Sequence, residues 1–233
     1  MMITESQPIL SMRHITKRFP GVVALDDVSF DVYSGQIHCL VGENGAGKST
    51  LMKIMSGVYI AFDGEIFLDN RSVHFGSTRE AQNVGIGMIH QELNLVPELT
   101  VFENVFLGRE YQNRIGIVDR QRMRQDTKKL LQNFGLDVDP NRTVSALRVG
   151  RQQLVEIAKA LNLNTRILIM DEPTSALSEA EVEYLFGVIR SLSKQQVAII
   201  YISHRFDEIM AIADQITVLR DGSVVDSTPA RIP

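Results

Sequence analysis

The order of apolar and polar positions predicts a chain of the α/β class. Several apolar runs have the length of a strand, and each is bounded by a turn signal or by polar residues. The predicted strands are residues 10–17, 23–32, 36–41, 65–68, 86–90, 167–170 and 198–202. The continuously apolar members of this set are typical of buried strands in a parallel or mixed sheet. Two further strands, 216–220 and 223–226, flank Asp221-Gly222, so a hairpin is predicted there.

Helical spacing of apolar residues predicts where the helices lie. Residues 48–55 place their apolar side chains on one side of a helix. Residues 101–163 are mostly helical in pattern, and residues 120–134 within them form a helix that is charged on one face and apolar on the other. Residues 227–233 carry no clear structural signal. A helical segment is therefore predicted to interrupt an α/β core, without internal repeats or long flexible linkers.

Composition and charge narrow the class of protein. The 233 residues suit one large domain, or one domain with an insert. A net charge of −4, with both signs mixed along the chain, gives no long-range attraction to nucleic acid or anionic lipid. The single cysteine, Cys39, lies in an apolar run and is predicted to be a buried, inert thiol. The longest apolar stretches are of strand length, far below the roughly 20 residues of a membrane helix.

The first candidate site is a glycine-rich loop at residues 42–49, which matches the pattern G-x-x-x-x-G-K-S. An apolar strand precedes it and a helical pattern follows, which is the setting that a phosphate-binding loop requires. Its glycines let backbone N–H groups surround phosphates, and the helix N-terminus adds partial positive charge. We expect Lys48 to reach the β- and γ-phosphates and Ser49 to coordinate Mg²⁺. An accidental glycine-rich turn would not explain the strand, the helix and the motif described next.

The second candidate site lies where residues 167–170 end in two acidic residues, Asp171 and Glu172. A carboxylate at the end of a buried strand suits the Mg²⁺ side of a nucleotide site, and the next carboxylate can polarise an attacking water. Taken alone, the pair would be interpreted as an ordinary acidic strand end in solvent. Together with the glycine-rich loop, it favours an Mg²⁺ site.

Two polar residues follow other predicted strands. Gln91 comes after residues 86–90, and His204 comes shortly after residues 198–202. A lone glutamine or histidine in a loop most often has no role beyond local hydrogen bonding. In an open α/β sheet, however, the carboxyl ends of the strands converge on the ligand. Gln91 is therefore a candidate sensor of the γ-phosphate or metal, and His204 a candidate γ-phosphate contact.

With these motifs the chain resembles the ATP-binding-cassette (ABC) ATPases, over nearly its whole length and in the order of that family. Phe19 stands where the family stacks an aromatic ring on adenine, and Gln91 resembles the Q-loop glutamine. The positions that resemble the Walker A loop are Gly42, Glu43, Asn44, Gly45, Ala46, Gly47, Lys48, Ser49 and Thr50. The implied fold is a P-loop NTPase core with an antiparallel β subdomain and a helical subdomain insert. The implied core covers about residues 1–90 and 164–233, and the implied insert about residues 91–163, of one cassette.

The same resemblance assigns roles in catalysis. Asp171 resembles the Walker B aspartate, Glu172 the general base and His204 the switch histidine. The implied cofactors are ATP and Mg²⁺. The implied catalytic residues are Lys48, Gln91, Glu172 and His204, and the implied Mg²⁺ ligands are Ser49, Gln91 and Asp171.

A narrower resemblance points to the bacterial sugar-import ATPases of the ribose, galactose and xylose type. The segments that carry it are residues 42–53, 103–110, 153–161, 172–177 and 201–205. Those proteins hold two cassettes in one chain, and residues 1–233 resemble the first cassette of a longer chain. The resemblance implies an ATP-hydrolysing subunit that powers import of a simple sugar at the cytoplasmic face of a bacterial membrane. The implied partners are a second cassette, transmembrane permease subunits and, indirectly, a periplasmic or extracellular sugar-binding protein, but no nucleic acid. The implied permease-docking surface is roughly residues 91–109.

The chain departs from the family in its signature, which ordinarily reads Leu-Ser-Gly-Gly-Gln. The corresponding residues here are Leu147, Arg148, Val149, Gly150 and Arg151. Arg148 lacks the serine hydroxyl and adds a long cation, which can either bind phosphate by charge or obstruct its approach. Ser178 stands where the family has an aspartate, which weakens the expected contact across the cassette interface. We therefore expect this cassette to supply an intact loop and catalytic residues, and to give its partner an altered signature.

Three other functions remain open at this level. A soluble ABC ATPase of translation or DNA repair would carry long coiled-coil or linker inserts, which this sequence lacks. A small-molecule phosphotransferase would need an acceptor pocket and would have no use for Gln91, the signature or His204. A regulatory nucleotide-binding module would bind ATP without hydrolysing it. The identity of the transported sugar does not follow from these residues.

Overall fold

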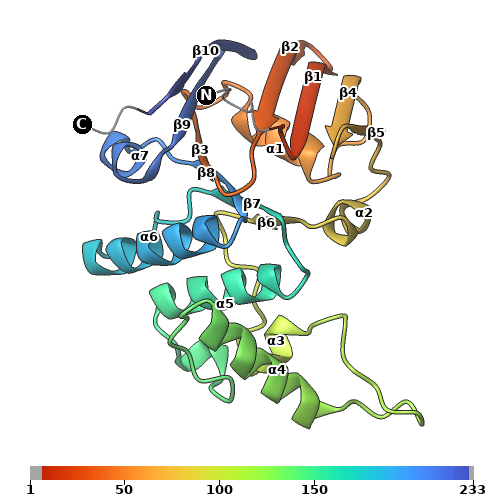
Figure 1. Ribbon diagram of the computed structural model, residues 1–233, viewed down its shortest axis with the longest axis vertical. Helices are drawn as coiled ribbons and strands as arrows, with labels where there is room; N and C mark the ends of the chain where they lie inside the picture. Colours follow the sequence, from red (N-terminus) through yellow and green to blue (C-terminus); the bar gives the residue numbers. More distant parts are fainter. Residues whose placement is uncertain (1–6, 231–233) are drawn as a thin grey trace, which may run out of the picture.

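Two β-sheets form the framework of residues 7–230, the part of the chain that the computed structural model describes (Figure 1). The first sheet has the strand order β2-β1-β4-β5 and is antiparallel throughout. Its strands are β1 (Leu10–Phe19), β2 (Val22–Val32), β4 (Asp63–Leu68) and β5 (Arg71–Val73). This sheet is the antiparallel β subdomain that the family resemblance implies.

The second sheet is mixed and has the strand order β10-β9-β3-β8-β7-β6. Its five strands from β9 to β6 are parallel, and β10 pairs with β9 as an antiparallel hairpin at one edge. The strands are β3 (Ile37–Val41), β6 (Ile86–Ile89), β7 (Ile167–Asp171), β8 (Ala198–Ile202), β9 (Gln215–Arg220) and β10 (Ser223–Pro229). The carboxyl ends of its parallel strands are brought to one edge, where the candidate site residues lie.

The helices divide into two groups. The helices around the sheets are α1 (Lys48–Met55), α2 (Thr78–Asn83), α6 (Glu179–Lys194) and α7 (Phe206–Ile212). Those that fall between β6 and β7 in the sequence are α3 (Val101–Val105), α4 (Arg120–Asn133), a 3-10 turn (Val144–Ala146) and α5 (Val149–Leu161). Figure 1 shows α3, α4 and α5 gathered at the end of the molecule opposite the antiparallel sheet. The predicted fold class is confirmed, and the subdomain boundaries stay a prediction.

Both faces of the mixed sheet are covered by apolar side chains. Along β8, Ile199 and Tyr201 join the cluster that also holds Phe102 of the helical region, whereas Ile200 and Ile202 join the cluster on the opposite face. This alternation follows the two-residue period of a strand. Burial on both faces explains why the central strands are apolar throughout.

Cys39 lies in β3 and is fully buried. Burial raises the pKa of its thiol to about 12, with a smaller contribution from the charge of Asp214. A thiol held in this form is a weak nucleophile. The prediction that Cys39 is buried is confirmed, and its inertness stays a prediction.

The last strand is longer than the sequence predicts. Residues 227–233 carry no clear structural signal, yet β10 continues to Pro229. Ser227, Thr228 and Pro229 pair with β9 across the hairpin, past an irregularity between Val224 and Asp226. An exposed edge strand made of polar residues carries no apolar period, so its sequence did not indicate a strand.

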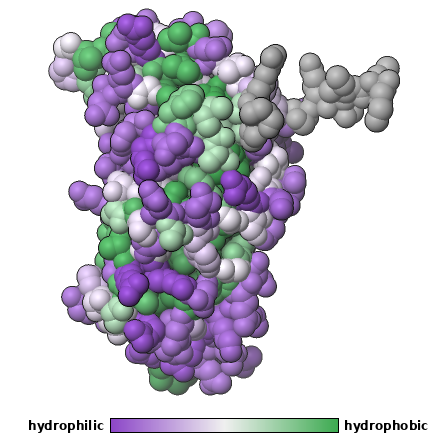
Figure 2. Space-filling model, turned by 90° about the vertical axis from the view of Figure 1, so that its left-hand side faces the viewer, coloured by the Kyte–Doolittle hydropathy of each residue, from purple (hydrophilic) through white to green (hydrophobic). Residues whose placement is uncertain are grey.

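No helix among residues 7–230 is long and apolar enough to cross a membrane. Hydrophilic and hydrophobic side chains are interspersed over the face of the molecule that Figure 2 presents. The large apolar side chains that are most exposed are Ile115, Phe206, Val225 and Ile117. Ile115 and Ile117 lie in one loop, whereas Phe206 and Val225 come from other segments of the chain.

His38 is a buried titratable group within β3. Its ring is 3% exposed and packs 4.4 Å from the ring of Phe30. Nδ1 lies 3.1 Å from the carbonyl oxygen of Asp31 and therefore donates to it, and Nε2 lies 2.7 Å from Thr217 Oγ1 and accepts. Both ring nitrogens of the neutral imidazole therefore have a hydrogen-bond partner. Burial lowers the pKa of His38 to about 4, although the Asp31 carbonyl and carboxylate act in the opposite direction.

We expect His38 to make the fold sensitive to acid. In the unfolded chain a histidine takes up its proton near pH 6.5, whereas folded His38 does so only near pH 4. Between these values the unfolded state binds more protons, so the free energy of unfolding falls as pH falls, by roughly 3 kcal/mol in total. Urea unfolding at pH 7 and pH 4.5 should show a smaller loss for His38→Gln than for the wild-type chain. Equal losses in the two proteins would contradict this assignment.

Candidate nucleotide site

The glycine-rich loop joins β3 to α1 and is fixed at both ends. The N–H of Ala46 donates to the carbonyl oxygen of Glu43 at 3.1 Å, and the N–H of Gly222 in the β9–β10 turn donates to the carbonyl oxygen of Ala46 at 3.2 Å. Gly47 is the N-cap of α1 and has φ of 105°, a conformation that side chains other than glycine rarely adopt. A Cβ at Gly47 would lie 2.7 Å from the carbonyl oxygen of Ala24. The loop thus packs closely on β2 where it leads into α1.

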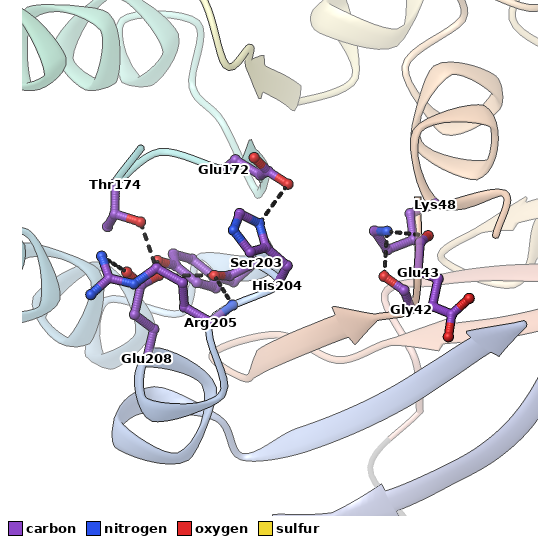
Figure 3. Close-up of polar contacts among 10 residues, drawn as sticks. Gly42, Glu43, Lys48, Glu172, Thr174, Ser203, His204, Arg205 and Glu208 are labelled. Carbon is purple, nitrogen blue, oxygen red and sulfur yellow. Dashed lines mark hydrogen bonds and ion pairs between the residues drawn. The ribbon is translucent and has the colours of Figure 1, made fainter. Parts of the chain in front are cut away.

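Lys48 is folded back into this loop. Its side chain is largely buried, and Nζ donates to the carbonyl oxygens of Gly42 at 2.6 Å and Glu43 at 2.9 Å (Figure 3). These contacts use two of the three donors of the ammonium group. Burial lowers the pKa of Lys48, whereas the charges of Glu172 and Asp171 act in the opposite direction. The lysine therefore places a cation inside the loop, as the sequence predicts.

An open pocket of about 220 Å³ brings most of the predicted site residues together. Its lining combines the glycine-rich loop, Gln91 in the loop after β6, and the end of β7. The lining residues are Asn44, Gly45, Gly47, Lys48, Ser49, Thr50, Gln91, Asp171 and Glu172. These residues are more than 120 positions apart at the extremes, and only the parallel sheet makes them neighbours.

The chemistry of the pocket suits a divalent cation. Burial raises the pKa of Asp171 and the adjacent charge of Glu172 raises it further, whereas His90, Lys48 and Lys53 act in the opposite direction. A bound cation would favour the ionised form of Asp171. Ser49, Gln91 and Asp171 offer hydroxyl, amide and carboxylate oxygens, the ligand types that Mg²⁺ takes. Among residues 7–230, no group of three or more His, Cys, Asp or Glu side chains is placed to hold a metal ion.

Glu172 and His204 form a pair at the ends of neighbouring strands. Because β7 and β8 are parallel and pair Asp171 with Ile202, the residues that follow them are adjacent. His204 Nδ1 donates to Glu172 Oε1 at 3.0 Å. Glu172 has φ of 46°, and its N–H donates to the carbonyl oxygen of Ile202 at 3.0 Å. Figure 3 shows this pair on one side of the site and Lys48 on the other.

The left-handed backbone at Glu172 is a local strain. A residue other than glycine in this conformation costs roughly 1–3 kcal/mol, and such residues gather at functional sites. The hydrogen bond to Ile202 holds the turn, which directs the Glu172 side chain toward His204. The sequence predicts both residues for the site but gives no sign of their mutual hydrogen bond.

Phe19 lies at the end of β1 and is not among the residues that line this pocket. Its ring packs edge-on against Tyr59, with 5.3 Å between ring centroids, and Lys17 Nζ lies 4.9 Å from the centre of the Phe19 ring. The adenine contact of Phe19 stays a prediction. Tyr59 and Lys17 are aromatic and cationic neighbours that the sequence did not indicate, because their proximity depends on the fold.

The altered signature surrounds the N-terminus of α5. Leu147 ends the 3-10 turn, Arg148 is the N-cap, and Val149, Gly150 and Arg151 form the first turn. Arg148 is exposed and makes no capping hydrogen bond with its side chain. Arg151 is held instead, since Nη2 donates to Asp137 Oδ2 at 2.9 Å and its guanidinium lies 5.9 Å from the ring of Tyr184. Of the two arginines, only Arg148 projects from the helix without such partners among the described residues.

Ser178 has a local role that the sequence analysis did not include. Its N–H and its hydroxyl donate to Glu181 Oε2 at 3.0 Å and 2.8 Å, which makes a capping box at the start of α6. These hydrogen bonds hold the pKa of Glu181 below its ordinary value. The spacing S-x-x-E at residues 178–181 is the signal that would have predicted it.

A family model described as ABC transporter matches residues 25–175. The chain belongs to the ABC transporter family. Relatives within it include the ribose import ATP-binding protein RbsA 1 of Rubrobacter xylanophilus, which is 53% identical over 96% of this chain and 45% of its own length. A putative ribose/galactose/methyl galactoside import ATP-binding protein of Burkholderia cenocepacia is 52% identical over 96% of this chain and 44% of its own. The chain thus spans less than half the length of these ABC relatives.

Solved ABC cassettes have the same fold. A nucleotide-free ATP-binding cassette from an ABC transporter superposes with a TM-score of 0.85 and 26% identity, over 96% of this chain and 92% of its own. A dimeric bacterial ABC transporter cassette gives a TM-score of 0.79 and 26% identity, over 95% and 99%. The two-sheet architecture described above is therefore that of ABC cassettes.

Proposed function

We propose that this chain is the first ATP-binding cassette of a two-cassette ATPase that powers import of a simple sugar. The observation that carries this proposal is the convergence of the glycine-rich loop, Gln91, Asp171 and Glu172 on one pocket, with His204 bonded to Glu172. The relatives named for ribose and galactose import, at 50–53% identity, support the substrate class. Their greater length supports a second cassette outside residues 1–233.

Each group of site residues has its own role in ATP hydrolysis. Residues 42–50 cradle the phosphates of ATP, with Lys48 on the β- and γ-phosphates and adenine against Phe19. Ser49, Gln91 and Asp171 would hold Mg²⁺, which would supply positive charge to the phosphate oxygens.

The Glu172–His204 pair acts on the attacking water. Glu172 orients the water in line with the γ-phosphorus and accepts its proton. His204 fixes the carboxylate through its 3.0 Å hydrogen bond. Together with Lys48 it stabilises the charge that develops on the phosphoryl oxygens.

The partners in this proposal are those of an importer. A second cassette covers the nucleotide with its own signature. The opening and closing of the two cassettes is transmitted to transmembrane permease subunits. The permease surface is the region of residues 91–109, where Leu107 is 42% exposed and lines a groove with Val118 and Met123. A periplasmic or extracellular sugar-binding protein is an indirect partner, and the chain works at the cytoplasmic face of a bacterial membrane.

Transport by the full-length protein tests this function. We expect vesicles that contain the permease, loaded with ATP and Mg²⁺, to take up ribose or galactose in the presence of the sugar-binding protein. Lys48→Ala should abolish uptake, because the loop loses the cation that reaches the γ-phosphate. Uptake that does not depend on ATP, or that survives Lys48→Ala, would contradict the proposal.

The altered signature gives a separate prediction. In the full-length protein, Arg148→Ser should raise ATP turnover by roughly fivefold, since a serine at the N-cap restores a hydroxyl worth about 1 kcal/mol. Arg151→Gln should add little to the turnover, because Arg151 is held by Asp137 and Tyr184. Steady-state phosphate release at saturating ATP measures both. Unchanged turnover in the double variant would show that the signature is not limiting.

A further inference from the structure

Glu208 is a buried carboxylate that the proposed mechanism does not use. It lies in α7, its residue is 2% exposed, and it is surrounded by polar groups from three other segments. Oε2 accepts hydrogen bonds from Thr174 Oγ1 at 2.9 Å, from Tyr201 Oη at 2.7 Å and from Ser203 Oγ at 2.9 Å. Oε1 lies 2.8 Å from Arg205 Nη1 in an ion pair, although the angles there fall outside hydrogen-bond geometry.

The hydroxyl groups that meet Glu208 belong to the segments that carry the catalytic pair. Thr174 stands two residues after Glu172, and Ser203 stands directly before His204. Figure 3 shows Thr174, Ser203 and Arg205 directed at Glu208, beside the Glu172–His204 contact. One carboxylate oxygen therefore connects the turn after β7 with the turn after β8.

The neighbouring groups are arranged so that each donates to Glu208. Burial raises the pKa of Tyr201, so its hydroxyl keeps its proton and remains a donor. Ser203 Oγ donates to Glu208 and at the same time accepts from the N–H of Arg205 at 3.1 Å, which fixes the backbone on both sides of His204. Arg205 adds an ion pair at the second oxygen of Glu208.

We propose that Glu208 is a positioning residue for hydrolysis. It holds the loop that carries Glu172 and the loop that carries His204 in a fixed position relative to each other. This inference rests on the proposed function of the site. The backbone of the two loops is joined by the hydrogen bond from Glu172 to Ile202, and Glu172 has a strained conformation there. The hydrogen bonds from Thr174 and Ser203 to Glu208 form a second connection between the two loops. None of the hydrogen-bond or ion-pair partners of Glu208 lines the phosphate pocket.

The test is Glu208→Gln in the full-length protein. An amide has one acceptor oxygen and brings an NH₂ donor among groups that are all donors, so either the hydroxyls or Arg205 lose their partner. We expect turnover at saturating ATP to fall about tenfold or more, since misplacing a reacting group by about 1 Å can cost ~100-fold. The dissociation constant for ATP should change less than about twofold, because the phosphate loop is untouched.

A matched control separates positioning from loss of stability. Thr165 is buried before β7, at the end of the strand away from the site, and its Oγ1 donates to the carbonyl oxygen of Ala160 at 2.7 Å. Thr165→Val should lower the melting temperature while turnover is kept. If Glu208→Gln does not fold, Ser203→Ala and Thr174→Val each remove one donor and should give smaller losses in the same direction. Turnover that falls no further than in Thr165→Val, or ATP affinity that falls as much as turnover, would overturn the proposal.

A second readout does not depend on ATP hydrolysis. Amide hydrogen exchange should be faster in residues 172–176 and 203–205 of Glu208→Gln and unchanged in residues 42–50. Unchanged exchange in the first two segments would overturn the positioning role, whatever the turnover. If the wild-type protein released no phosphate, the proposed function would fail, whereas the exchange result would still decide whether Glu208 orders the two loops.

Discussion

Glu172→Gln will leave ATP binding intact and lower ATP turnover by at least ~100-fold, the scale of a lost general base. Glutamine has the size of glutamate and can still accept the hydrogen bond from His204 Nδ1, which joins the wild-type carboxylate at 3.0 Å. It cannot take a proton from water. The left-handed turn at this residue and its bond to Ile202 involve the backbone alone, so the loop keeps its shape. Equilibrium binding of ATP and single-turnover hydrolysis measure the two effects separately.

The control for this variant is Glu183→Gln, the same chemical change at an exposed position of α6. It should hydrolyse ATP as the wild-type protein does. Full turnover by Glu172→Gln would remove Glu172 from its proposed role. Loss of ATP affinity together with turnover would show instead that Glu172 shapes the binding pocket.

Gly47→Ala will weaken ATP binding by roughly tenfold or more, by distorting the loop that cradles the phosphates. Two effects combine at this position. The backbone has φ of 105°, and the added Cβ would lie 2.7 Å from both the carbonyl oxygen of Ala24 and Leu25 Cδ2. The leucine can move, but the carbonyl belongs to β2 and cannot move without disturbing the antiparallel sheet. The glycine-rich loop must therefore change its conformation.

Gly45→Ala is the matched variant for this prediction. Gly45 has φ of 86° in the same loop, but a Cβ there meets no atom within 4 Å. It should lose less ATP affinity than Gly47→Ala, because only the backbone preference is violated. Gly116→Ala, with φ of 80° and open space outside the site, reports the cost in melting temperature alone. Equal affinities for ATP in Gly45→Ala and Gly47→Ala would contradict the packing argument.

Several elements with a clear period were predicted from sequence, but helix α6 was not, although its buried Val182, Leu185 and Ile189 recur at helical spacing. Helix α1 begins and ends at the predicted residues, because its apolar spacing and the preceding glycine define the extent of the helix. The hairpin follows from Asp221-Gly222. Helix α2 has one buried residue, Ala81, so it produces no apolar period to detect. Strand β10 extends beyond its predicted end for the same reason.

Some features of the candidate site were likewise predicted from sequence, and others were not. Its loop, Asp171, Glu172 and Gln91 were predicted because their residue types recur at fixed places relative to strands, and the structure brings them to one pocket. The contacts of Glu208 could not be predicted, since they join residues at positions 174, 201 and 203 through the packing of α7 on the sheet. Arg151 was grouped with Arg148 from sequence, although its bond to Asp137 gives it a different role.

The fate of the γ-phosphate of ATP tests the central claim most directly. The full-length protein is supplied with ATP, Mg²⁺ and a range of simple sugars, and both free phosphate and phosphorylated sugar are measured. The geometry of Glu172 beside His204 predicts that the γ-phosphate is released as free inorganic phosphate, at a rate that Glu172→Gln abolishes. Transfer of the phosphate to a sugar, or binding of ATP without any release of phosphate, would contradict it.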